Sequence, residues 1–328
     1  YVAMRIKAAL PQWRNNKQVA GLARSRFVGC MIGGAIGDAM GMPAEGFSRH
    51  QIIKRFGEIT HLLPHITKKG TKPAGSWTDD TFTSMMTAKS ILEVGRVDVD
   101  HLIPTYIDGL NYGFGIAGTT RRALELRSQG YDISSLKNGR HAGAGATVRS
   151  APIALFHAND LEALKADVQA VSEITHQDRD AVAAAVMVGF TIAWAVRGEL
   201  DPKVLIHKLK ALSQDLGSNL HYNLSLTEEL LASGVRSEEC MDEIGRGGSV
   251  MQVIPSAYYA FLAHPKDFLK TIQVAVNAGG DADTRAAIAG YISGAYNGIE
   301  QIPSNLVKKL ENFQLIADYA ERLFFYAA

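Results

Sequence analysis

The stretch Gly29-Cys30-Met31-Ile32-Gly33-Gly34-Ala35-Ile36-Gly37-Asp38-Ala39-Met40-Gly41 decides how this chain folds. The spacing of its apolar residues predicts a helix over residues 27–42, yet a glycine recurs every three or four residues. A glycine inside a helix costs about 1 kcal/mol relative to alanine, but it lets another backbone approach closely. We therefore expect this helix to pack tightly against another part of the core.

Helical spacing of apolar residues continues along the rest of the chain. It predicts further helices over residues 79–94, 119–128, 145–158, 161–174, 179–196, 203–214, 226–234, 250–263, 267–277, 284–298 and 304–325. No strand ladder is convincing, and residues 58–63 form either a short strand or an irregular approach to a loop at 64–76. No shift in composition divides the chain, so we predict an all-α fold with a single domain over residues 22–328.

Residues 1–21 are predicted to be a basic lead-in to this domain. The first 26 residues carry six lysines or arginines and no acid, a pattern that transit peptides share. We interpret them as a solvated segment before the first helix, with a transit peptide as the alternative.

The overall composition disfavours several classes of partner. The chain has 328 residues, with 34 Lys and Arg against 33 Asp and Glu, so its net charge of +1 supports neither nucleic-acid nor membrane-surface binding. The longest apolar run, Ala181–Val196, is shorter than the roughly 20 residues of a membrane span and predicts a buried core helix. Two cysteines, Cys30 and Cys240, make neither a disulfide framework nor a four-cysteine zinc site, so we expect a reducing, cytoplasmic setting.

Two acidic motifs each open a predicted helix. They are Gly75-Ser76-Trp77-Thr78-Asp79-Asp80-Thr81 and Gly279-Gly280-Asp281-Ala282-Asp283-Thr284. Taken singly, each is explained by helix capping, with acids at the positive end of the helix dipole. Taken together, they offer four carboxylates that would repel one another and two hydroxyls, an oxygen-rich set that suits Mg²⁺ or Mn²⁺. We therefore predict that the two motifs share a site for two divalent cations.

Three further features are candidates for ligand binding. Glu45, just after the glycine-rich helix, is either a surface acid or a carboxylate aimed into a cleft. The run Gly139–Arg149 places small residues before a helix and is either a phosphate-binding loop or a plain flexible loop. His176, before the core helix, is either a ligand-facing imidazole or a cap, and alone we favour the cap. The run Gly113–Gly118 matches the dinucleotide fingerprint GxGxxG, but no buried strand precedes it, so we do not interpret it as such a site.

In combination these motifs resemble the ADP-ribosylglycohydrolase family. The resemblance rests on the glycine-rich helix with Asp38 and Glu45, the two acidic motifs, the glycine loop ending in Arg149 and Pro152, and Thr175-His176. Their order and separation fit the family over roughly residues 22–305.

The resemblance implies a fold, a chemistry and a set of site residues. The fold would be a single orthogonal multi-helix domain with a two-metal cleft, and the reaction would be hydrolysis of the bond between ADP-ribose and a modified acceptor. Two Mg²⁺ or Mn²⁺ ions would be held by Thr78, Asp79, Asp80, Asp281, Asp283 and Thr284. Glu45 or Asp79 would be the acid/base group of an oxocarbenium-like cleavage. The ADP-ribose diphosphate and ribose would contact Gly143, Ala144, Gly145, Ala146, Thr147 and His176.

Some positions depart from the family pattern. Ala144 stands where many members have a polar residue, and Gly115 stands where members acting on ADP-ribosylated arginine have an aspartate. The expected partner is an ADP-ribosylated substrate, with a protein side chain as the leading acceptor. The alternatives are nucleic-acid-linked or small-molecule-linked ADP-ribose, or a member that binds ADP-ribose without catalysis. The near-zero net charge disfavours nucleic acid, and we expect no membrane partner.

Overall fold

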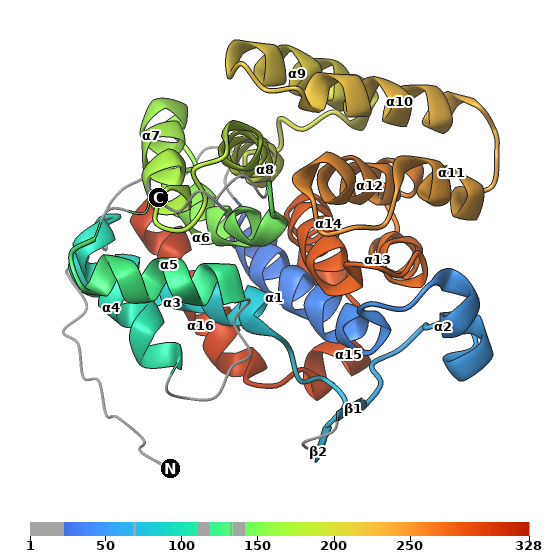
Figure 1. Cartoon of the computed structure of the whole chain (residues 1–328), viewed down its shortest axis with the longest axis horizontal. Helices are drawn as coiled ribbons and strands as arrows, with labels where there is room; N and C mark the ends of the chain where they lie inside the picture. The colour runs from blue at the N-terminus through green and yellow to red at the C-terminus, as the bar shows by residue number, and fades with distance from the viewer. Residues whose placement is uncertain (1–22, 68–69, 111–117, 132, 134–141, 328) are drawn as a thin grey trace.

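The computed structural model describes residues 23–67, 70–110, 118–131, 133 and 142–327, which form α-helices and one small hairpin (Figure 1). The α-helices are α1 (Arg24–Gly41), α2 (Arg49–Phe56), α3 (Asp79–Val94), α4 (Val99–Leu110), α5 (Gly118–Ser128), α6 (Ser150–Phe156), α7 (Leu161–Ser172), α8 (Arg179–Val196), α9 (Pro202–Asp215), α10 (Leu220–Ala232), α11 (Ser237–Ile244), α12 (Val250–Ala263), α13 (Phe268–Asn277), α14 (Ala282–Asn297), α15 (Ser304–Lys309) and α16 (Phe313–Ala327). Short 3-10 turns are η1 (Met42–Ala44), η3 (Ala144–Arg149) and η4 (Ile299–Gln301), and the strands are β1 (His65–Thr67) and β2 (Gly70–Lys72). The predicted all-α fold class is confirmed.

The glycine-rich helix α1 packs directly against α14, and the two lie side by side at the centre of the molecule (Figure 1). The closest approaches pair residue 29 with 294, 33 with 290, 37 with 286 and 41 with 282, so the helices are antiparallel. A Cβ atom on Gly37 would lie 2.0 Å from the carbonyl oxygen of Ala286, and one on Gly294 would lie 1.9 Å from that of Gly29. Only glycine allows this separation, which confirms the predicted tight packing.

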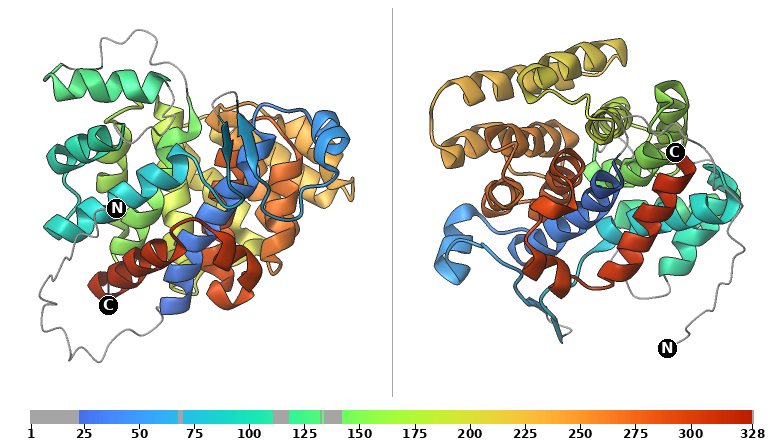
Figure 2. Two further views of the ribbon diagram at one scale, coloured as in Figure 1. Left: turned by 90° about the horizontal axis from the view of Figure 1, so that it is seen from below. Right: turned by 180° about the vertical axis from the view of Figure 1, so that it is seen from behind.

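The other helices surround this pair. Helix α16 packs on α1, helices α12 and α13 pack on α14, and α8 lies against α6, α7 and α14; Figure 2 shows the arrangement from below and behind. Two segments, Arg24–Ala44 and Arg179–Val196, are long and apolar enough to cross a membrane by length and composition. Their apolar windows are 100% and 83% buried inside the fold, as in core helices. The prediction of a buried core helix at Ala181–Val196 is therefore confirmed.

Three helices, α2, α4 and α11, were not predicted. Helix α2 buries only Ile52 and depends on a capping box between Ser48 and Gln51. Helix α4 contains Pro104, and α11 has only eight residues. The hairpin β1–β2, with antiparallel register, lies inside the segment expected to be a loop.

The predicted helix 304–325 is divided into α15 and α16. Leu310 is extended and Asn312 has a positive φ of 56°. The segment before α3 is hydrogen-bonded to the chain at this break. The Glu311 N–H donates to the Gly75 carbonyl at 3.0 Å, and the indole N–H of Trp77 donates to the Glu311 carbonyl at 3.0 Å. The interruption therefore anchors the first acidic motif, which local periodicity did not reveal.

Candidate functional site

The first acidic motif is held at the start of α3 by a buried aspartate of α1. Thr78 is the N-cap, and its hydroxyl oxygen accepts a hydrogen bond from the Asp80 N–H at 3.2 Å. The carboxylate of Asp38 accepts from the Thr78 N–H at 3.0 Å and from the N–H and hydroxyl of Thr81 at 3.0 and 2.6 Å. The capping interpretation of Thr78 is thus right, and Asp38, to which the sequence assigned no role of its own, fixes the turn.

The second acidic motif is held at the start of α14 by a turn that only glycine can form. Gly279 and Gly280 have φ of 76° and 68°, and a Cβ atom on Gly280 would lie 1.9 Å from the carbonyl oxygen of Arg246. The Gly280 N–H donates to the Phe47 carbonyl at 2.8 Å, and the Asp281 N–H donates to the Arg246 carbonyl at 2.9 Å. Asp281 occupies the N-cap position, but within the described residues its side chain makes no capping hydrogen bond.

The two motifs meet as one electrostatic cluster. Asp80 and Asp283 are each 6% exposed, and among the described residues Oδ2 of Asp80 and Oδ1 of Asp283 have no hydrogen-bond partner. Burial raises the pKa of Asp80 well above its ordinary value, and the charge of Asp79 raises it further, whereas a hydrogen bond from Thr284 lowers it. Burial likewise raises the pKa of Asp283, followed by repulsion from Asp80. The carboxylates therefore destabilise one another unless a positive charge or protons offset them.

These residues fit a cation by their chemistry more than by their present spacing. Within the described part of the chain, no three His, Cys, Asp or Glu side chains are already gathered as ligands of one metal ion. The unpartnered oxygens are nevertheless buried carboxylate oxygens beside threonine hydroxyls, which are the donors that Mg²⁺ and Mn²⁺ prefer.

Glu45 lies at the edge of this cluster. It follows η1, and the adjacent Gly46 N–H donates to the Gly280 carbonyl at 2.8 Å. Its pKa is raised by desolvation first and then by the charges of Asp281 and Asp79, while Lys72 of β2 lowers it. Glu45 is exposed, as in the surface-acid alternative, and it is coupled electrostatically to the two motifs. Its role as a carboxylate aimed into a cleft stays a prediction.

The predicted phosphate loop is joined to the acidic cluster by a segment that the sequence did not single out. This linking segment is Gly245–Ser249, between α11 and α12. The Ala144 N–H donates to the Gly248 carbonyl at 3.2 Å, and a Cβ atom on Gly248 would lie 3.0 Å from Oδ2 of Asp281. Its three glycines, Gly245, Gly247 and Gly248, were the available signal.

The basic side of the site consists of Arg149, Thr175 and His176, and it lies next to the predicted phosphate loop. Arg149 is 1% exposed, and its Nη2 donates to the hydroxyl oxygen of Thr175 at 2.5 Å. That oxygen lies 2.7 Å from Nδ1 of His176, and burial and the charge of Arg149 lower the pKa of His176 to about 3. The cap favoured for His176 is wrong, because Asp178 caps α8 by accepting from the N–H groups of Asp180 and Ala181.

Several predicted features lie outside the described residues. They are the basic lead-in at 1–21, positions 113–117 of the GxGxxG run including Gly115, and residues 139–141 of the glycine loop.

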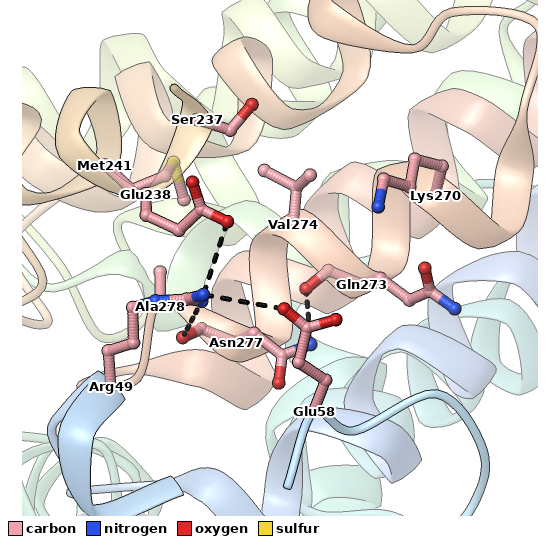
Figure 3. Close-up of a pocket in the computed structure, with 10 residues that line it drawn as sticks. All are labelled: Arg49, Glu58, Ser237, Glu238, Met241, Lys270, Gln273, Val274, Asn277 and Ala278. Atoms are coloured by element: carbon pink, nitrogen blue, oxygen red, sulfur yellow. Dashed lines mark hydrogen bonds and ion pairs between the residues drawn. The ribbon is translucent and has the colours of Figure 1, made fainter. Parts of the chain in front are cut away.

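A pocket lies next to the second acidic motif (Figure 3). Arg49 points into it and pairs with Glu238 at 3.2 Å and Glu58 at 3.5 Å, while its Nη1 donates to the Asn277 carbonyl at 3.4 Å. Its volume of about 40 Å³ has room for a few waters. Neither this pocket nor a second one beside Arg26 is lined by a predicted site residue.

Comparison with known proteins places these motifs in a family. The family model described as ADP-ribosylglycohydrolase matches residues 21–327. An uncharacterised protein of Archaeoglobus fulgidus is 32% identical, with 91% of this chain and 96% of that protein covered. The ADP-ribosylarginine hydrolase Tri1 of Serratia proteamaculans is 30% identical over 91% of this chain and 79% of its own, and the ADP-ribosylhydrolase ARH3 of Gallus gallus is 27% identical over 88% and 90%. A solved ADP-ribosylglycohydrolase-related protein complex matches with a TM-score of 0.73 at 27% identity, covering 93% of this chain and 99% of that one. The chain belongs to the ADP-ribosylglycohydrolase family.

Proposed function

We propose that this protein is a metal-dependent hydrolase that releases ADP-ribose from a modified acceptor, with a protein side chain as the leading acceptor. One observation carries the proposal: Asp80 and Asp283, from two distant helix starts, are buried together with carboxylate oxygens that have no partner among the described residues. Buried charge of one sign is costly unless it is offset, and a divalent cation offsets it most directly.

The cations would be held by the oxygen donors of the two motifs. These are Thr78, Asp79, Asp80, Asp281, Asp283 and Thr284. Two Mg²⁺ or Mn²⁺ ions bound there would supply Lewis-acid chemistry at the substrate's oxygens.

The chain's own residues would orient the substrate and move the proton. Glu45, held beside the second motif through Gly46, would give or take the proton at the scissile bond, with Asp79 as the other candidate. The loop Gly143–Thr147 and His176 would bind the diphosphate and the ribose. The Ala144 N–H already donates to Gly248, so its contribution to the ligand would be its small, buried side chain.

The direct test is release of ADP-ribose from arginine-, serine- and nucleotide-linked substrates in Mg²⁺, Mn²⁺ or EDTA. We expect release from at least one protein-linked substrate, dependent on the cation, and loss of turnover in Asp283→Ala. The matched control is Asp160→Ala, which removes an exposed carboxylate that caps α7 far from the cluster. Turnover unaffected by EDTA would refute the metal-dependent mechanism.

The same panel separates the alternatives. Release only from nucleotide-linked or small-molecule-linked ADP-ribose would change the acceptor while leaving the chemistry in place. Tight binding of ADP-ribose with no release from any substrate would replace the hydrolase by a binding protein.

The identity of the acid/base group needs a separate variant. Glu45→Gln keeps the size of the side chain and removes its proton exchange, so we expect kcat to fall at least about a hundredfold if Glu45 has this role. Cation-dependent thermal stabilisation should remain, because Glu45 is not among the proposed ligands. Unchanged kcat would assign the role to Asp79.

A further inference from the structure

His176 is held by a chain of hydrogen bonds whose direction is fixed at one end. Arginine has only donors, so the bond from Arg149 Nη2 makes the hydroxyl oxygen of Thr175 an acceptor. The hydroxyl proton of Thr175 is then free to be donated to Nδ1 of His176, 2.7 Å away. Arg149 Nη2 also lies 3.4 Å from the same Nδ1, where a second proton would oppose it. The contact with Arg149 therefore requires Nδ1 to be an acceptor, and the Thr175 hydroxyl can then donate to it.

The guanidinium group is itself fixed from its other side. It lies 5.7 Å from the centre of the Tyr106 ring, and the Tyr106 hydroxyl is 2.6 Å from that of Thr87. The Thr87 hydroxyl donates to the Thr83 carbonyl at 2.8 Å, so the Tyr106 hydroxyl donates to Thr87 and its oxygen can accept from Arg149. Arg149 thus stands between two acceptors, and it is 1% exposed.

The opposite edge of the imidazole faces the glycine loop. A Cβ atom on Gly145 would lie 3.7 Å from Cε1 and 3.9 Å from Nε2 of His176. A neutral imidazole that accepts at Nδ1 carries its proton on Nε2. Burial and the neighbouring cation keep the ring neutral, as the lowered pKa of about 3 indicates.

We propose that Arg149 and Thr175 are positioning residues that hold His176 as the Nε2–H tautomer, so that it presents a fixed donor to an anionic group bound at Gly145. The identity of that anion, a phosphate of ADP-ribose, rests on the proposed function. The assignment of the His176 tautomer does not rest on the proposed function. The arrangement gives a neutral donor that stays the same over the physiological pH range, so binding would not depend on charging the ring.

Nitrogen NMR of the imidazole tests the tautomer without any ligand. Long-range ¹H–¹⁵N spectra of the full chain at pH 7 distinguish a protonated ring nitrogen from an unprotonated one, and His176→Gln assigns the signal. We expect an unprotonated Nδ1 and a protonated Nε2. A protonated Nδ1 in the unaltered protein would overturn the proposal.

Variants test whether Arg149 and Thr175 cause this state. Thr175→Val removes the hydroxyl at nearly constant shape, and Thr175→Ser restores it. Arg149→Met removes the donor that sets the direction, and the signal of a protonated Nδ1 should then appear. If Arg149→Met does not fold, Arg149→Lys, which keeps a donor, and the two Thr175 variants decide the point. Unchanged tautomer and unchanged affinity in both Thr175→Val and the arginine variant would contradict the positioning role.

Calorimetric titration with ADP-ribose measures the consequence for binding. We expect Thr175→Val to weaken binding about tenfold, as for loss of one hydrogen bond near a charged ligand, and Thr175→Ser to bind nearly as the unaltered protein does. The control is Thr191→Val, since Thr191 is a buried threonine whose hydroxyl bonds Tyr258 in the core. An equal loss in Thr191→Val would reduce the effect to general destabilisation. If the unaltered protein fails to bind ADP-ribose, the proposed function fails, and the NMR result still decides the tautomer.

Discussion

The acidic and basic sides of the site bury charge in opposite ways. On the basic side, Arg149 donates to neutral acceptors, and the chain of bonds ends on an imidazole whose pKa is lowered to about 3. On the acidic side, Asp80 and Asp283 keep buried oxygens without a partner among the described residues, and they raise one another's pKa. The basic side also leaves one buried atom, Nε of Arg149, without a partner among the described residues, but it buries a single cation among neutral groups. The acidic side instead gathers several carboxylates that repel one another, which is the electrostatics of a site that needs a cation.

The acidic side also contains its own internal contrast. Asp38 is fully buried, and burial raises its pKa, yet three donors from the start of α3 satisfy its oxygens and oppose that rise. A buried acid is therefore structural where donors saturate it and a candidate ligand where they do not.

Asp38→Ala should have the largest effect. It leaves the N–H groups of Thr78 and Thr81 and the Thr81 hydroxyl without their acceptor, so we expect the free energy of unfolding to fall by about 3–5 kcal/mol. Urea denaturation measures it. Asp38→Asn, which keeps one acceptor oxygen, should lose less, and equal losses in the two variants would contradict the saturation argument.

Gly37→Ala should disrupt the close packing of α1 against α14. The new Cβ atom would lie 2.0 Å from the Ala286 carbonyl oxygen, and we expect a loss of about 2–3 kcal/mol despite the better helix propensity of alanine. The matched control is Gly189→Ala in α8, where the nearest atom would be 3.5 Å away. That variant should gain up to about 1 kcal/mol in thermal or urea unfolding. A gain in both would show that α1 and α14 can separate freely.

The pH dependence of stability tests the basic side. The pKa of His176 is lowered in the folded state to about 3, against about 6.5 when unfolded, so the unfolded chain binds more protons between these values. Stability from this group is complete above pH 6.5 and is lost as the pH falls, by about 2 kcal/mol at pH 5. The difference in unfolding free energy between the protein and His176→Gln should shrink by that amount from pH 7 to pH 5. A constant difference would mean that the ring is not held neutral.

Asp283→Asn should have the smallest effect on the fold, and of the opposite sign. In EDTA it removes repulsion with Asp80, so we expect a gain of about 1–2 kcal/mol, with loss of any stabilisation by Mg²⁺. Asp267→Asn, which changes an N-cap outside the cluster, should leave both quantities nearly unchanged. Destabilisation of Asp283→Asn in EDTA would show that this carboxylate is already satisfied.

Local patterns predicted the parts of the fold and site that are set locally. The helix at 79–94 was predicted with the bounds that α3 has, because a capping threonine, two early acids and apolar spacing all agree there. The two acidic motifs were predicted to meet, and the structure couples them electrostatically. Their roles as metal ligands stay predictions.

What escaped prediction depends on contacts between distant segments. Nothing near Asp38 indicates that its carboxylate reaches Thr78 and Thr81. The linking segment Gly245–Ser249 acquires its role by bonding both the phosphate loop and the second motif. His176 was interpreted as a cap because its partner Arg149 lies 27 residues earlier and meets it only in the folded chain.

The pairing of α1 with α14 also sets the order in which the chain can fold. The first described helix is apolar and is buried from Gly29 to its end at Gly41, and the partner that covers its glycines begins only at Ala282. During synthesis, α1 therefore leaves the ribosome long before α14 exists, and contacts between such distant segments form slowly. The nascent chain must keep this apolar helix shielded until α14 has been made, so we expect its unassisted refolding to be slow and prone to aggregation.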